Sequence, residues 1–207
     1  MRIVKDSAER RTQILDVSEE LFASKGYVST STNDIIEQVG IARGTLYYHF
    51  KSKEEILDAV VLRFTNNLIK KAREVSKDTS IPLLDRISLT MKSLSSDTPL
   101  GRELLSEIHK SENALLHQKV QDIMISNIAL IFEQMIKEGN EQGLFNCSYP
   151  FAVADMIITY SYIAFDSTRE ISLEDKKLLI KGFIVNIERL LGVAEGSLVN
   201  SILKIFE

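Results

Sequence analysis

Apolar residues recur at spacings of three and four along nearly the whole chain of 207 residues, and this period limits the possible folds more than any other feature. No segment shows the clean alternation of apolar and polar residues that marks a half-exposed strand. The pattern is interrupted by only 3 prolines and 9 glycines, most of them where one periodic segment gives way to the next. We therefore predict an all-α chain of about ten helices.

Helix-capping residues set the predicted boundaries. Gly26 and Gly40 end the first two helices, and each proline lies at the opening of a later one. Ser52 and the glutamates after it match a capping box, in which side chains satisfy free backbone amides at a helix start. The predicted helices are 7–25, 33–39, 42–49, 52–76, 82–95, 102–109, 113–138, 150–166, 172–192 and 197–206.

Size and composition exclude several classes of protein. The chain is 44% hydrophobic and 26% charged, which suits a globular fold with a sizeable core. No window reaches the roughly 18 apolar residues of a membrane helix, and the first residues lack a signal-peptide core. Cys147 is the only cysteine, so an intrachain disulfide and a cysteine-based zinc site are excluded. We expect a cytoplasmic protein with no cofactor and no membrane partner.

Three of the predicted helices fall within the first 50 residues, and a tight turn at Gly40 joins the last two. This is the layout of a helix-turn-helix. The turn requires a residue that tolerates positive φ, which glycine does, and Ile41 can close a small core with Ile36 and Leu46. Because any compact helix pair produces a similar pattern, the residues displayed by the second helix carry more weight.

That second helix is the most specific part of the sequence. It reads Ala-Arg-Gly-Thr-Leu-Tyr-Tyr-His-Phe over residues 42–50 and is followed by Ser-Lys-Glu at 52–54. A recognition helix needs side chains that reach base edges and flanking groups that bind phosphates. Further residues of the same pattern are Leu21, Phe22, Gly26, Tyr27, Thr32, Asp34, Ile35 and Gly40.

With these residues, the segment from about 11 to 57 resembles the DNA-binding domain of the TetR/AcrR family of transcriptional regulators. The resemblance implies a helix-turn-helix domain over residues 1–53, a linking helix over 54–76, and a helical ligand-binding and dimerisation domain over 77–207. The sequence departs from the family at Ile41 and Ala42, where members often carry Val and Ser. This departure leaves the operator sequence open.

The predicted DNA contacts divide into base readers and phosphate binders. Arg43 and Thr45 are the candidates for base edges, Arg43 through guanine O6 and N7. Gly44 allows close approach of the backbone, and Thr32 adds its hydroxyl to free amides at a helix start. Without the motif, a Tyr-Tyr-His cluster would more often be a protein contact or partly buried surface. The predicted DNA-binding residues are Thr32, Ala42, Arg43, Gly44, Thr45, Tyr47, Tyr48, His49 and Lys53.

The predicted helices 150–166 and 172–192 are the most apolar in the chain. The first is apolar nearly all round, so it must be covered on more than one side. The resemblance implies that the two helices form a two-fold dimer interface, which would also place two recognition helices one turn of DNA apart. The alternative is that both helices are simply core. The candidate interface residues are Ile157, Phe165, Phe183, Ile187 and Leu190.

The resemblance also implies a small-molecule effector that binds between the central helices and changes the spacing of the two DNA-binding heads. Residues of these types in such positions are more often core than ligand contacts. His109 and Glu112 would lie one turn apart in an unbroken helix and could share a metal with His117. The candidate effector contacts are Phe64, Leu68, Met91, His109, Met124, Ile128, Phe132 and Tyr160.

The predicted function is therefore a ligand-responsive repressor, not an enzyme, that binds a palindromic double-stranded operator as a homodimer. A helical protein-interaction module and a metal-assisted hydrolase remain as alternatives. The net charge is −4, but residues 1–73 carry 12 basic and 10 acidic side chains, whereas residues 74–207 carry 13 and 19. The head is thus only mildly basic, which predicts weak non-specific DNA affinity.

Overall fold

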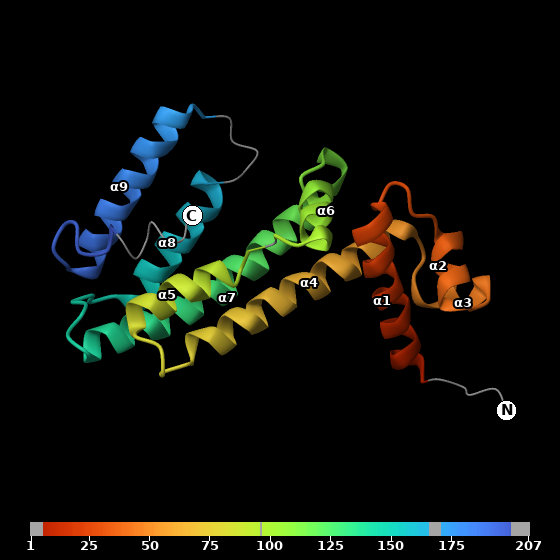
Figure 1. Cartoon of the computed structure of the whole chain (residues 1–207), viewed down its shortest axis with the longest axis horizontal. Coiled ribbons are helices and arrows are strands. Elements are labelled where there is room, and N and C mark those ends of the chain that lie inside the picture. Colours follow the sequence, from red (N-terminus) through yellow and green to blue (C-terminus); the bar gives the residue numbers. More distant parts are fainter. Residues whose placement is uncertain (1–5, 96, 166–170, 200–207) are drawn as a thin grey trace. The chain divides into compact units, whose positions relative to one another are not determined.

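In a computed structural model that describes residues 6–95, 97–165 and 171–199, every regular element of the described chain is a helix (Figure 1). The predicted all-α class is confirmed. Residues 200–206 of the predicted helix 197–206 lie outside the described residues. The elements are α1 (Ser7–Lys25), α2 (Thr32–Val39), α3 (Arg43–His49), α4 (Lys53–Ser76), α5 (Leu83–Lys92), α6 (Pro99–Ile108), the 3-10 turn η1 (Ser111–Asn113), α7 (Ala114–Glu141), α8 (Pro150–Ala164) and α9 (Leu173–Leu191).

Most helix ends follow from the capping residues of the sequence. Ser31 and Asp34 form a reciprocal capping box at the start of α2, and Ser172 accepts a backbone N–H at the start of α9. Gly40 ends α2 in the left-handed conformation, with φ of +70°, as the predicted turn requires. Gly192 ends α9 in the same way.

Three predicted boundaries are wrong by three residues. α5 ends at Lys92 instead of residue 95. α6 begins at Pro99 instead of residue 102, because Thr98 caps it by accepting the N–H of Gly101 at 3.0 Å. α7 continues to Glu141 instead of stopping at residue 138. Gly139 lies inside this helix, and the Phe145 ring packs on it so closely that an added Cβ would lie 2.1 Å from a ring carbon.

The chain divides into two compact units, residues 1–66 with 96–120, and residues 67–95 with 121–207. The first unit therefore contains α6 and the start of α7 in addition to the predicted DNA-binding head. This division differs from the predicted limits at residues 53 and 76, which followed sequence resemblance alone.

The first unit has one hydrophobic core, to which α1–α4 and the later helices α6 and α7 all contribute. Each fully buried large apolar side chain stabilises such a core by about 1.5–3 kcal/mol. The core includes Ile14, Leu15, Phe22, Ile35, Val39, Leu46, Phe50, Ile56, Leu57, Val60, Val61, Leu104, Ile108 and Leu116.

The second unit buries apolar residues of α5, α7, α8 and α9, among them Leu83, Ile128, Met135, Ile158 and Ile184. A buried arginine joins three of its segments. Arg86 is 2% exposed and donates to the Ser76 carbonyl at 3.1 Å and to the Glu138 carboxylate. A buried charge needs such partners, since an unpaired one would strongly destabilise the fold.

No helix in the described ranges is long and apolar enough to cross a membrane.

Candidate DNA-binding surface

α2, the turn at Gly40 and α3 form a helix-turn-helix beside α1 (Figure 1). The turn is closed by the N–H groups of Gly40 and Ile41, which both donate to the Ile36 carbonyl, at 3.0 and 3.2 Å. Leu46 is fully buried and Phe50 nearly so, so the inner face of α3 is fixed in the core. The outer face of α3 therefore has a defined position.

The outer face of α3 exposes the predicted base-reading residues. Ala42, Arg43 and Gly44 are exposed, and Thr45 is half-buried. A Cβ added at Gly44 would meet no other atom within 4 Å, so the fold itself does not require glycine at this position. Glycine inside a helix costs about 1 kcal/mol relative to alanine. Gly44 therefore leaves the backbone of α3 uncovered on its outer face.

The start of α2 meets the middle of α3 through two hydroxyl groups. The Thr32 hydroxyl lies 3.5 Å from the Tyr47 hydroxyl, and the Arg43 guanidinium stacks over the Tyr47 ring at 5.6 Å. Hydrogen bonding by Thr32, and then by Arg43, lowers the pKa of the Tyr47 phenol. Together with the free amides of the first turn of α2, these groups form a cluster of donors suited to a phosphate.

Tyr48 is 72% exposed, and its ring meets that of His49 edge-on, with 5.0 Å between the centroids. A tyrosine this exposed in an ordered helix gains little from the fold itself. Its amphipathic ring is available to an external partner, in agreement with the predicted phosphate contact.

Lys53 lies in a different environment from the one predicted. Its ammonium donates to the carbonyls of Tyr27 and Thr30, both at 2.9 Å, and contacts the Val28 carbonyl at 3.5 Å. It also lies 4.1 Å from the centre of the Tyr27 ring. An ammonium has three donors, and these contacts engage all three. Lys53 thus ties the start of α4 to the α1–α2 turn, which does not favour a phosphate contact.

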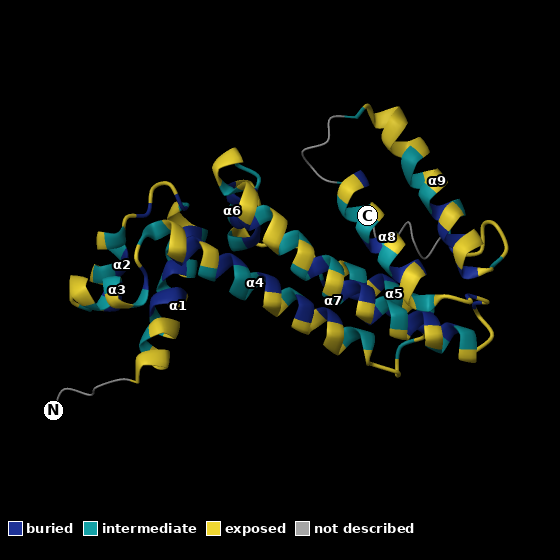
Figure 2. Ribbon diagram, turned by 180° about the vertical axis from the view of Figure 1, so that it is seen from behind, coloured by how far each residue is buried: buried dark blue, intermediate teal, exposed yellow. Residues whose placement is uncertain are grey.

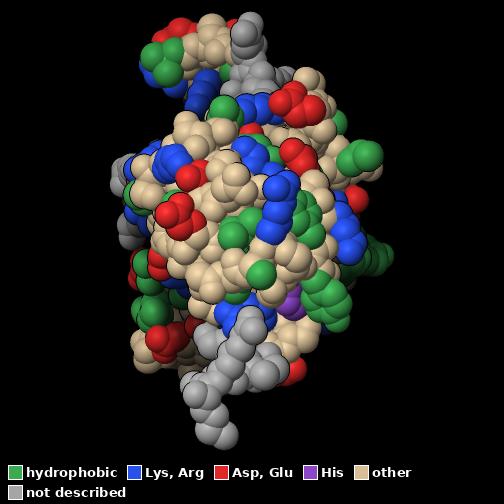
Figure 3. Space-filling view, turned by 90° about the vertical axis from the view of Figure 1, so that its right-hand side faces the viewer, with side chains coloured by type: hydrophobic (Ala, Val, Ile, Leu, Met, Phe, Trp, Pro, Cys, Tyr) green, Lys and Arg blue, Asp and Glu red, His purple; other side chains and the backbone are tan. Residues whose placement is uncertain are grey.

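Lys51, which was not among the predicted DNA contacts, is an exposed cation at the end of α3. Its ammonium contacts the Tyr47 carbonyl at 3.3 Å, next to the predicted phosphate-binding residues. Its position directly after the Tyr-Tyr-His-Phe run could have marked it as a candidate phosphate contact. Figure 3 views the end of the molecule that carries α2 and α3, and basic and acidic side chains are mixed on it. This agrees with the small net charge of the head.

The candidate effector contacts are distributed over both compact units. Phe64 and His109 belong to the first compact unit and the other six to the second. Phe64 packs against the core of the first unit, whereas Met124 and Ile128 are buried in the second. Tyr160 is partly exposed and stacks on Phe183, with 5.5 Å between the ring centroids.

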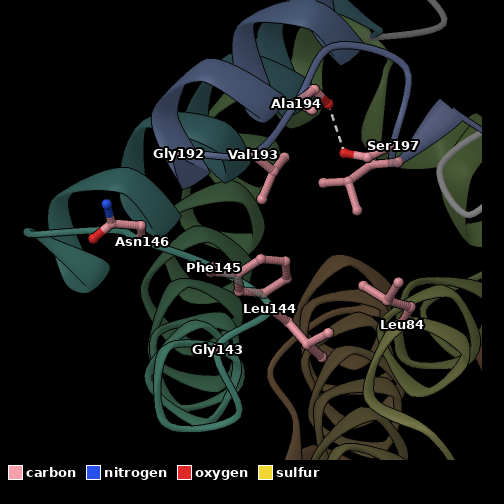
Figure 4. Close-up of a pocket in the computed structure, with 10 residues that line it drawn as sticks. Leu84, Gly143, Leu144, Phe145, Asn146, Gly192, Val193, Ala194 and Ser197 are labelled. Atoms are coloured by element: carbon pink, nitrogen blue, oxygen red, sulfur yellow. Dashed lines mark hydrogen bonds between the residues drawn. The ribbon is translucent and has the colours of Figure 1, made fainter.

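The second unit contains a cavity of about 330 Å³ that none of these candidates lines (Figure 4). Its apolar wall includes Leu84, Leu144, Phe145 and Val193, and the loop residue Asn146 lies at its edge.

The predicted interface residues on α8 and α9 are unequally exposed. Ile187 is buried within the chain, Ile157, Phe165 and Phe183 are half-buried, and Leu190 is at the border of exposure. Several other large apolar side chains of the two helices are more exposed. These are Phe151, Met156, Tyr160 and Ile163 on α8 and Leu173 and Leu178 on α9, where exposed positions prevail in the N-terminal half (Figure 2).

The arrangement considered for a shared metal is interrupted. α6 ends at Ile108, so His109 and Glu112 do not lie one turn apart in a single helix. The rings of His109 and His117 are 4.8 Å apart, edge to face. Over the described ranges, no group of three or more His, Cys, Asp or Glu side chains is placed to hold a metal ion.

A helix-turn-helix with an exposed recognition helix, followed by a helical body, defines the class of helix-turn-helix regulatory proteins. Two family models place the chain within this class. The model of bacterial regulatory proteins of the tetR family matches residues 14–60. A model of the tetracyclin repressor-like C-terminal domain matches residues 97–177. The chain belongs to the TetR family.

Individual relatives agree with this assignment. The repressor KstR2 of Rhodococcus jostii is 42% identical over 66 residues, 32% of each chain. The fatty acid metabolism regulator protein of Bacillus subtilis is 28% identical over 143 residues, 68% of this chain and 73% of that one. Matches to the KstR2 repressors span about a third to two fifths of their length.

The crystal structure of a TetR-family regulator from Pectobacterium atrosepticum has the same fold. Its TM-score is 0.64 at 20% identity, and the match covers 94% of this chain and 98% of that one.

Proposed function

We propose that the protein is a cytoplasmic transcriptional repressor that binds a palindromic DNA operator as a homodimer and is released by a small-molecule effector. The observation that carries this proposal is the outer face of α3. It presents Arg43, Thr45 and Tyr48 around a glycine that the fold itself does not require.

In the proposed complex, α3 lies in the major groove. Arg43 reads guanine O6 and N7, and Thr45 and the Ala42 methyl meet neighbouring base edges. The Thr32–Tyr47 hydroxyl pair, Tyr48, His49 and Lys51 bind phosphates on either side and fix the register. Lys53 acts indirectly, because its ammonium holds the turn that leads into α2.

The homodimer is supported by the apolar surface of α8 and α9. Met156, Ile163 and Leu178 are each more than half exposed, and large exposed apolar patches often mark a protein–protein interface. Pairing of this surface around a two-fold axis would bring two heads to one operator. Half-sites about one helical turn apart would follow from that symmetry.

The effector is proposed to bind in the helical body, and its release mechanism is a change in the spacing of the two heads. Acyl compounds are the first class to test, because the relative that matches most of the chain is named as a regulator of fatty acid metabolism.

An α-helical module that contacts another protein through Tyr48 is the second candidate. The two differ in one respect: DNA binding requires the close backbone approach that Gly44 permits, whereas a protein contact does not. The absence of a glycine requirement within the fold favours DNA.

Selection from a random library of 30-base-pair duplexes tests the proposal without knowledge of the operator. The full chain should enrich a site with two inverted half-sites, and the Arg43→Ala chain should not. Failure of the wild-type chain to enrich any sequence, with stable protein throughout, would contradict it.

A further inference from the structure

The turn between α1 and α2, residues 26–31, is held from two sides by side chains from distant parts of the chain. The N–H of Tyr27 lies beyond the end of α1 and donates to the Glu103 carboxylate of α6 at 2.5 Å. The Lys53 ammonium of α4 binds the carbonyls of Tyr27 and Thr30. One side chain thus holds the turn by its N–H and the other by its carbonyls.

Gly26 makes room for the carboxylate. Its φ of +83° is in a region that L-residues with a side chain rarely adopt, and an added Cβ would lie 3.3 Å from a Glu103 carboxylate oxygen. The approach of Glu103 to this turn is therefore close, and a side chain at position 26 would crowd it.

The turn leads directly into the proposed phosphate site. The Thr30 hydroxyl donates to the Gly26 carbonyl at 2.7 Å, the next residue caps α2, and Thr32 is the first residue of that helix. Thr32 lies five positions after Tyr27 in the chain. A change in the position of Tyr27 must therefore be taken up within a short segment in which Tyr27, Thr30 and Ser31 are held by hydrogen bonds.

We propose that Glu103 is a positioning residue for DNA binding: from α6 it fixes the α1–α2 turn and thereby the start of α2. This inference rests on the proposed function. Glu103 lies in the part matched by the C-terminal family model, and Tyr27 in the part matched by the N-terminal one. The DNA-binding head is thus completed by a side chain that the later part of the sequence supplies.

The test compares the full-length wild type with Glu103→Ala and Glu103→Gln, and uses Glu112→Ala as the control. Glu112 is an exposed carboxylate of the same compact unit, so its removal changes the charge equally. The readouts are hydrogen exchange of residues 26–34 compared with α9, and affinity for the selected duplex.

A hydrogen bond to a charged group contributes enough for roughly tenfold effects. Glu103→Ala should raise exchange of residues 26–34 about tenfold, leave α9 unchanged, and weaken specific DNA binding roughly five- to tenfold. Glu103→Gln should recover part of both, since its amide oxygen still accepts the N–H. Glu112→Ala should match the wild type.

Unchanged exchange over residues 26–34 in Glu103→Ala would overturn the inference. An equal rise in hydrogen exchange over α9 would also overturn it, because Glu103 would then stabilise the whole protein and not the turn in particular. A wild type without sequence preference would remove the proposed repressor function. In that case, a selective rise in exchange would still support Glu103 as the residue that positions the turn.

Discussion

The head and the α8–α9 pair differ in how far their large apolar side chains are exposed. In the head, the large apolar side chains of α2 and α3 that face inward, Ile35 and Leu46, are fully buried within one chain. On α8 and α9, side chains as large as Ile163 and Leu178 remain 60% and 67% exposed. The head is complete as a folded surface in a single chain, whereas α8 and α9 still carry apolar area to bury. In the proposed function, the head binds DNA, and the α8–α9 surface pairs with another copy of the chain.

Substitution of a buried and an exposed leucine by alanine tests this contrast with the largest expected effect. Leu46→Ala should lower the free energy of unfolding by about 2–5 kcal/mol, because it leaves a cavity in the core, at every protein concentration. Leu178→Ala should destabilise the protein less and in a concentration-dependent way, because its contacts come from a partner. Urea unfolding at two protein concentrations measures both. If both substitutions lowered the free energy of unfolding equally and at every protein concentration, the contrast between the head and the α8–α9 surface would be wrong.

A charge on the α8 surface should separate the protomers. Ile163→Glu is expected to raise the dimer dissociation constant about a hundredfold or more, because an unpaired carboxylate would be buried between protomers. Sedimentation velocity measures the change, and circular dichroism should show an unchanged helix content. The control is Glu174→Gln on an exposed position of α9. Dimers that persist in Ile163→Glu would place the interface elsewhere.

Gly44→Ala should change stability and DNA binding in opposite directions. Because the added methyl meets no atom of the chain, the free protein should gain up to about 1 kcal/mol in helix stability. The same methyl should lower affinity for the selected duplex roughly tenfold or more by blocking backbone approach. Thermal melts and anisotropy titrations measure the two quantities. An affinity equal to that of the wild type would remove the main reason for placing DNA at this face.

The smallest expected effect concerns the start of α2. Hydrogen bonds from Lys25, then from the backbone and side chain of Ser31, hold the pKa of Asp34 well below its ordinary value of 3.8. A lowered pKa in the folded state stabilises the protein above the unfolded value, and this contribution is lost as pH falls below about 3.8. Asp34→Asn should therefore melt lower than the wild type at pH 6, and the difference should shrink between pH 5 and pH 3. A difference that stays constant over this range would show that the Asp34 charge does not stabilise the fold.

The sequence predicted those parts of the molecule whose signals are local. The helices, the turn at Gly40 and the burial of Leu46 follow from periodicity and from the conformational freedom of glycine. The role of Lys53 was missed because its carbonyl partners lie 23 to 26 positions earlier in the chain, and nothing near Lys53 in the sequence marks them. The link from Glu103 to Tyr27 spans 76 positions and is equally invisible to a local pattern.

The predicted effector contacts also depend on long-range packing that a local sequence pattern does not reveal. Apolar periodicity identified Met124 and Ile128 as inward-facing, and both are buried, but it did not distinguish a ligand-binding wall from ordinary core. Placement of such residues in one site depends on how helices pack, which the spacing within each helix does not specify. The candidates were therefore divided between two compact units.

The central claim is that α2 and α3 of a dimer recognise a specific DNA sequence. An anisotropy titration of wild type and Arg43→Ala against the selected duplex and a scrambled duplex, at two salt concentrations, tests it most directly. We predict two protomers per selected duplex, a preference of at least about a hundredfold over the scrambled one, and loss of most of that preference in Arg43→Ala. The claim would be contradicted if the wild type bound both duplexes with equal affinity and if both affinities fell equally as the salt concentration rose.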